Sequence, residues 1–166
     1  DRYLMPPELQ RRVWIGHDDT HLQIALRSPK PLKLRTRAGA DGDASAIESG
    51  DHWWLTIPVG GAKYHFKINP DGAFSDQRVL PEHKGKGSRH RLGIEFDSKA
   101  RTAAHVGETF WSAELSIPFA SLGLDAAPEA GALWRVWLSA ARGYSGHDRA
   151  EWNGGAGWMN WQWGIL

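Results

Sequence analysis

Tryptophan is the residue whose number and spacing most clearly suggest a chemistry in this 166-residue chain, which contains ten of them. A flat indole can cover the apolar C–H face of a sugar ring, while neighbouring amides and hydroxyls bind its hydroxyl rim. Residues 151–161, EWNGGAGWMNW, place such groups in a glycine-rich stretch. Unless these indoles instead close one end of the fold as core, we expect them to form a carbohydrate site with their polar neighbours: Trp152, Asn153, Trp158, Asn160 and Trp161.

Two further tryptophans, Trp53 and Trp54, are adjacent in a segment that reads as a strand. Adjacent strand residues point to opposite faces, so one indole belongs to the core. The other is either a second sugar platform or covered by a loop, and the spacing does not say which residue has which role. Three other tryptophans alternate with apolar residues and are predicted to be core: Trp14, Trp111 and Trp134.

Acidic residues in two predicted loops have the oxygen ligands that calcium prefers. These aspartates, which turn chemistry alone could also explain, are Asp18, Asp19, Asp41 and Asp43. Zinc binding through His17 and His21 would need a third ligand that the sequence does not identify. No motif supports a haem ligated by Met5 or Met159.

The sequence gives little support for a catalytic site. The chain has no cysteine, which excludes cysteine nucleophiles, disulfides and cysteine-ligated metals. Glu95 and Glu114 would be the carboxylate pair of a glycosidase, and Tyr64, His65 and Arg91 would be the groups of a lyase-like site, but no spacing supports either arrangement. We therefore expect no enzymatic activity.

The elements that must hold these residues are short segments of alternating apolar and polar residues, a period typical of antiparallel strands. Asp18–Thr20 and Pro70–Gly72 have turn-forming residues, and Pro118–Gly123 predicts one helical turn closed by glycine. Residues 38–50 and 80–91 are expected to be loops. About ten strands without a helix layer favour a β-sandwich of one domain, residues 1–166, over a barrel with helices. The expected strands are Arg12–His17, His21–Ser28, Leu32–Arg37, Trp53–Val59, Lys63–Asn69, Ala73–Val79, Leu92–Asp97, Arg101–Val106, Thr109–Ile117, Trp134–Arg142 and Asn160–Leu166.

The stretch Phe110–Leu124, FWSAELSIPFASLGL, and the residues after it resemble the C-terminal half of carbohydrate-binding module family 9. The earlier segments 17–22 and 64–72 fit the family pattern more loosely. Tryptophan stands at position 54, where relatives often have an acidic residue, and residues 137–139 lack the usual asparagine. The resemblance implies a jelly-roll-like antiparallel β-sandwich that binds sugars, often with structural calcium. The residues that carry it are Trp111, Glu114, Ile117-Pro118-Phe119, Leu122-Gly123, Pro128, Gly131, Trp134 and Arg142.

Charge and hydropathy narrow the function further. Twenty basic and nineteen acidic side chains give a net charge of +1, which supplies no general attraction for nucleic acid or anionic membrane. No apolar run is long enough to insert into a membrane, and the N-terminus has no signal-peptide core, as expected of a mature or excised chain. The basic segment Lys84–Arg91 is either a solvated loop or a contact for an acidic glycan.

We expect a non-catalytic carbohydrate-binding module that targets a tethered catalytic domain to a polysaccharide or oligosaccharide. Such a module would work outside the cytoplasm, in the periplasm, at the cell surface or in the extracellular space. Two alternatives stay open. One is a structural or interdomain module without sugar affinity, which the altered run Asp51–Trp54 favours. The other is a small stand-alone enzyme acting on polysaccharide.

Overall fold

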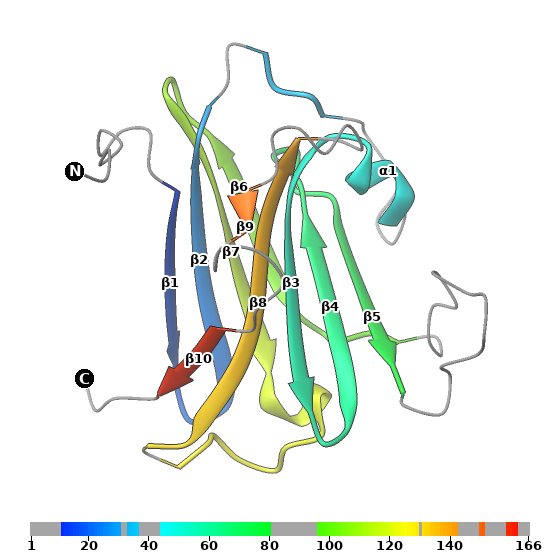
Figure 1. The fold of residues 1–166 in the computed structure, drawn as a ribbon, viewed down its shortest axis with the longest axis vertical. Coiled ribbons are helices and arrows are strands. Elements are labelled where there is room, and N and C mark those ends of the chain that lie inside the picture. Colours follow the sequence, from blue (N-terminus) through cyan, green and yellow to red (C-terminus); the bar gives the residue numbers. More distant parts are fainter. Residues whose placement is uncertain are drawn as a thin grey trace.

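Two antiparallel sheets form the protein, as the strand pattern predicts (Figure 1). The computed structural model describes residues 11–30, 33–36, 44–80, 96–129, 131–142, 150–151 and 159–162. One sheet has four strands in the order β1-β2-β7-β6, and the other has the order β10-β8-β3-β4-β5 with β9 paired to β8. The strands are β1 (Arg12–His17), β2 (His21–Pro29), β3 (Asp51–Val59), β4 (Ala62–Ile68), β5 (Phe74–Val79), β6 (Arg101–Val106), β7 (Phe110–Pro118), β8 (Leu133–Arg142), β9 (Ala150–Glu151) and β10 (Met159–Gln162).

The core lies between the inner faces of the two sheets. Strand side chains alternate between faces, so every second residue of the central strands reaches this layer. On β7 the inward residues are the ones that the alternation predicts: Trp111, Ala113, Leu115 and Ile117. The opposing sheet contributes the buried residues Trp53, Leu55, Ile57, Tyr64, Phe66, Ile68, Val136, Leu138 and Ala140.

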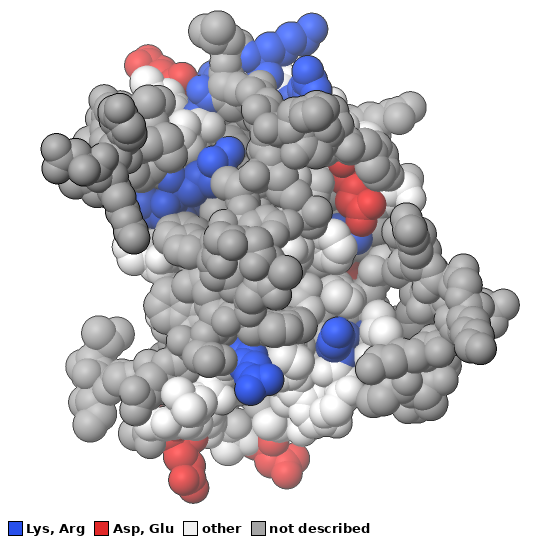
Figure 2. Space-filling view, in the orientation of Figure 1, with Lys and Arg blue, Asp and Glu red and all other residues white. Residues whose placement is uncertain are grey.

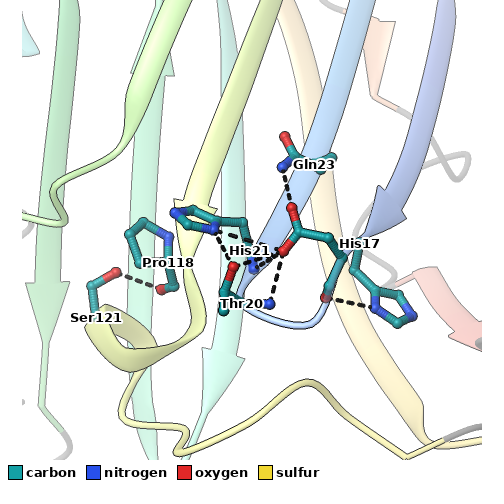
Figure 3. Close-up of polar contacts among 7 residues, drawn as sticks. His17, Thr20, His21, Gln23, Pro118 and Ser121 are labelled. Carbon is teal, nitrogen blue, oxygen red and sulfur yellow. Dashed lines mark hydrogen bonds and ion pairs between the residues drawn. The ribbon is translucent and has the colours of Figure 1, made fainter.

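Pro118 ends β7, and the chain then forms the short 3-10 helix η3 (Phe119–Leu122). The Ser121 hydroxyl donates to the Pro118 carbonyl at 2.6 Å, which Figure 3 shows beside the β1–β2 turn. Gly123 closes the helix with a φ of 75°, a left-handed conformation that costs glycine little. The predicted helical turn over Pro118–Gly123 is confirmed.

Two segments differ from the predicted elements. The predicted loop 38–50 contains the helix α1 (Ala44–Glu48), which contacts β3, β4 and β5 and fully buries Ile47. A helix of five residues is too short to show a helical period, so its one apolar anchor was not recognised. Residues 33–36 of the predicted strand Leu32–Arg37 are not in a strand, although Leu34 still packs on the core.

Other predicted elements fall partly outside the described residues. Residues 92–95 of the segment Leu92–Asp97 lie outside them, and Phe96 and Asp97 form no strand. The last predicted strand, Asn160–Leu166, corresponds to β10, whose described residues end at Gln162.

Candidate functional site

The adjacent indoles of β3 divide between the two faces of the six-stranded sheet. Trp53 is 1% exposed and is the indole that belongs to the core, as predicted for one of the two, so it cannot be a sugar platform. Trp54 points to the outer face and is half-buried. The strand alternation required this division, but the packing of the second sheet against the Trp53 side decided which indole became core.

Trp54 lies within a group of aromatic and polar side chains that we call the Trp54 face. Register places them together: Trp54 pairs with Lys67 and Ser139, and Thr56 pairs with His65 and Trp137. The outer side of β3, β4 and β8 therefore combines two indoles with hydroxyl, imidazole and ammonium groups. The Trp54 face consists of Trp54, Thr56, His65, Lys67, Trp137 and Ser139.

The aromatic rings of the Trp54 face form a corner. The ring centroids of Trp54 and Trp137 are 5.1 Å apart, with an angle of 86° between the ring planes. The Lys67 ammonium lies 4.7 Å from the centre of the Trp54 ring, within the range of a cation–π contact. The Trp54 indole N–H donates to His65 Nδ1 at 3.3 Å. Trp54 is thus fixed in orientation before any ligand arrives.

His65 is held in its neutral form at the floor of this corner. Its burial, followed by the positive charges of Lys67 and Lys63, lowers its pKa to about 4. Nδ1 accepts the Trp54 N–H and lies 2.8 Å from the Thr56 hydroxyl. A neutral imidazole that accepts at Nδ1 carries its proton on Nε2, so it can donate one hydrogen bond from that atom.

Helix α1 supplies the acidic partner of this face. Its Glu48 carboxylate accepts a hydrogen bond from the Lys67 ammonium, which is only 4% exposed. Lys67 thus has both a carboxylate and an indole as neighbours, which offsets the cost of burying its charge. In Figure 1, α1 lies beside the end of β3 where that strand begins.

The Ser139 hydroxyl of this face lacks a hydrogen-bond partner among the described residues. Ser139 is 1% exposed, and its Oγ makes no hydrogen bond within the described part of the chain. Buried hydroxyls are normally paired because desolvation without a partner costs free energy. Ser139 is the register partner of Trp54, so this hydroxyl is beside the aromatic corner.

The C-terminal residues predicted to bind sugar are only partly placed. Trp152, Asn153 and Trp158 lie outside the described residues. The backbone of Asn160 and Trp161 belongs to β10, opposite Arg135 and Trp134 of β8. Their contribution to a site stays a prediction.

The three tryptophans predicted to be core have different places. Trp111 is buried, and Trp134 packs at the core edge with its ring 6.1 Å from Phe119, so both predictions are confirmed. Trp14 is 51% exposed, and its prediction is wrong. It stands between Val13 and Ile15, which take the inner side of β1 and leave the indole on the outer side.

Asp18 serves the turn between β1 and β2, whose residues Thr20, His21 and Gln23 appear in Figure 3. Its carboxylate accepts hydrogen bonds from the backbone N–H groups of Thr20 and His21 at 2.7 and 2.8 Å, and from the Thr20 hydroxyl and Gln23 amide. These bonds, those from Thr20 first, hold its pKa well below the usual range. The described residues include no group of three or more potential metal ligands. Calcium binding by Asp18, Asp19, Asp41 and Asp43 stays a prediction, with Asp41 and Asp43 outside the described residues.

The structure separates the residues of the imagined catalytic sites. Tyr64 is buried in the core, whereas its neighbour His65 is on the outer face, so these two side chains cannot act on one substrate. Glu114 is exposed on the outer face of the four-stranded sheet. Glu95 and Arg91 lie outside the described residues.

Thr56, Lys67, Trp137 and Glu48 were not recognised as site residues from the sequence. Trp137 had a usable signal, because Val136 and Leu138 on either side of it are apolar and one set must face outward. Glu48 had none, since its role depends on a helix that the sequence pattern did not predict.

Charge on the described surface is dispersed. Figure 2, in the orientation of Figure 1, shows Lys and Arg atoms at separate places and not as one continuous patch on the described part of this face. No helix in the described ranges has the length and apolarity needed to cross a membrane.

Comparison with known proteins supports the architecture. No protein-family model and no curated protein sequence matches the chain. Its structure is similar to a protein from Bacteroides uniformis assigned as carbohydrate-binding, with a TM-score of 0.61 and 14% identity over 94% of this chain and 70% of the other. It is also similar to a family 9 carbohydrate-binding module from Caldicellulosiruptor kristjanssonii, solved in complex with cellotriose. The chain has a family 9-like fold.

The second similarity has a TM-score of 0.50 and 11% identity, and it covers 86% of this chain and 64% of that module. At such low identities the likeness concerns the fold, and function must be argued from the side chains.

Proposed function

We propose that this chain is a non-catalytic carbohydrate-binding module and that sugar binds at the Trp54 face. The observation that carries the proposal is the perpendicular pair of Trp54 and Trp137, 5.1 Å apart, set among polar groups on a family 9-like fold. One indole offers a stacking surface to a pyranose ring. His65 Nε2 is suited to donate to one of its hydroxyls.

The expected affinity is modest. A sugar face of about 100 Å² buried on an indole contributes roughly 2.5 kcal/mol before association costs are subtracted. Two such contacts with a few hydrogen bonds correspond to dissociation constants of roughly millimolar to micromolar. A weak module of this kind is useful when tethered, because it raises the local concentration of an attached catalytic domain at a polysaccharide. We propose this targeting role outside the cytoplasm.

The C-terminal tryptophans are the second part of the proposal. Trp152, Trp158 and Trp161, with Asn153 and Asn160, would add platforms and amide groups to the same module. Within this segment, the backbone of β10 (Met159–Gln162) pairs with β8, the strand that carries Trp137.

Affinity electrophoresis and calorimetry with soluble cello-, xylo- and manno-oligosaccharides test the proposal. Trp137→Ala should weaken binding about tenfold or more, a loss of at least 1.4 kcal/mol. Leu133→Ala is the matched control, because Leu133 is on the same strand and 71% exposed. It should bind as the unchanged protein does. If Trp137→Ala and Trp54→Ala bind normally while Trp158→Ala does not, the site is in the C-terminal segment.

A specific observation favours one alternative, a structural module without sugar affinity. Much of the Trp54 face is buried, with Lys67 and Thr56 almost inaccessible. If none of the oligosaccharides binds, this alternative replaces the proposal. Release of soluble product from a polysaccharide would instead show an enzyme.

A further inference from the structure

The outer face of the four-stranded sheet, on the opposite side of the sandwich from the Trp54 face, carries an exposed tryptophan of its own. Trp14 of β1 is 51% exposed there. Register continues the surface over β2, β7 and β6, where Trp14 lies in a row with Ala25, Glu114 and Ala103. We call this surface the Trp14 face. It also carries Arg12, Gly16, Arg27 and His105.

The space beside the Trp14 indole is open. Its register partner Ala25 has a small side chain. Gly16, two residues along the same side of β1, has none, and a Cβ built there meets nothing within 4 Å. A flat ring can therefore approach Trp14 without displacing any neighbour among the described residues.

The next row across the sheet is basic. Arg12 is directly opposite Arg27, and the row continues through Ser112 to His105. Two like charges directly opposite each other on a sheet destabilise the pair. The Arg27 guanidinium lies 3.9 Å from the centre of the ring of Phe110 on β7, so it leans to the side of β2 that is away from Arg12. The two arginines therefore present separate positive charges along this row, and an anion on this face would be attracted by both.

The spacing joins the indole and the cations into one site. Arg12 and Trp14 are two residues apart on the same side of β1, which is about 7 Å along a strand. Guanidinium groups bind carboxylates with paired hydrogen bonds, and an indole covers an apolar ring face. A ring with an attached carboxylate matches both groups at once.

We propose that the Trp14 face binds an acidic polysaccharide built from uronic-acid rings. Trp14 stacks on one ring, and Arg12 and Arg27 receive a carboxylate of the same chain. This site is independent of the Trp54 face, because it is on the other sheet and faces the opposite way. A neutral glycan carries no charge that Arg12 and Arg27 would attract, so carboxylate is the distinguishing feature of the ligand.

Affinity electrophoresis in gels containing polygalacturonate, with calorimetry on oligogalacturonates, tests the proposal. Trp14→Ala and Arg12→Gln should each weaken binding about tenfold or more. Trp14→Ala should keep its melting temperature, because an exposed indole contributes little to the core. Gly16→Asp, which places a carboxylate in the open space, should weaken binding without removing any contact. Two control variants remove an exposed apolar and an exposed basic side chain elsewhere, Leu133→Ala and Lys33→Gln, and should bind normally.

Three results would overturn the inference. One is the absence of polygalacturonate binding by the unchanged protein. Another is binding that Trp14→Ala leaves intact. The third is an equal loss in Arg12→Gln and Lys33→Gln, which would indicate attraction to net charge alone. If Trp14→Ala still binds neutral oligosaccharide, the Trp54 face acts separately. If only Trp137→Ala loses the binding of neutral oligosaccharide, that result bears only on the proposed function.

Discussion

Acidification should destabilise this protein through His65. The pKa of His65 is about 4 in the folded state, against about 6.5 for an exposed imidazole. A base whose folded-state pKa is lowered binds more protons when unfolded, so stability is full above pH 6.5 and falls as the pH drops toward 4. Between pH 7 and pH 4.5 the loss amounts to about 2 kcal/mol. For a domain of this size, that corresponds to roughly 4–8 °C in melting temperature.

The assay compares thermal and urea unfolding of the unchanged protein and His65→Asn at these two pH values. Asparagine keeps an acceptor near the position of Nδ1 but does not titrate, so the variant should lose about 2 kcal/mol less on acidification. His105→Asn is the control, because His105 is exposed on β6. It should retain the full dependence. Equal acid-induced losses in the protein and in His65→Asn, or an NMR titration of His65 near pH 6.5, would refute the reasoning.

Four further predictions concern the core, structural calcium, the turn and the buried ion pair. Trp53→Ala and Trp111→Ala should each lower the free energy of unfolding by about 3–5 kcal/mol in urea melts, because both leave a cavity; losses under 1 kcal/mol would contradict their core placement. If calcium is bound structurally, a chelator should lower the melting temperature, and an unchanged melting temperature would rule out structural calcium. Asp18→Ala should lower the melting temperature even with chelator present, because its turn hydrogen bonds are lost. Glu48→Gln should lower the free energy of unfolding by roughly 1–3 kcal/mol, because it leaves the Lys67 ammonium without its carboxylate. The double variant Glu48→Gln/Lys67→Met should recover part of this free energy. No recovery would argue against the ion pair.

The period of two in the sequence was sufficient to predict the class of fold. The core face of β7 followed from the alternation of Trp111, Ala113, Leu115 and Ile117 with polar residues. The turn glycine Gly72 and the glycine that closes η3 have positive φ, as their turns require. These features are local, since a strand's two faces and a turn's backbone are set by neighbouring residues.

The positions of the tryptophans needed the tertiary structure. Alternation placed Trp53 and Trp54 on opposite faces, and the apolar residues Leu55 and Ile57 on the Trp53 side were a signal for the core face. What surrounds Trp54 on the other face depended on the tertiary structure. Trp54 and Trp137 come together because β3 and β8 pair in a register set by residues more than eighty positions apart, which no local pattern encodes. For Trp14, the sequence VWI in β1 allowed either face, and the inward packing of Val13 and Ile15 left the indole exposed.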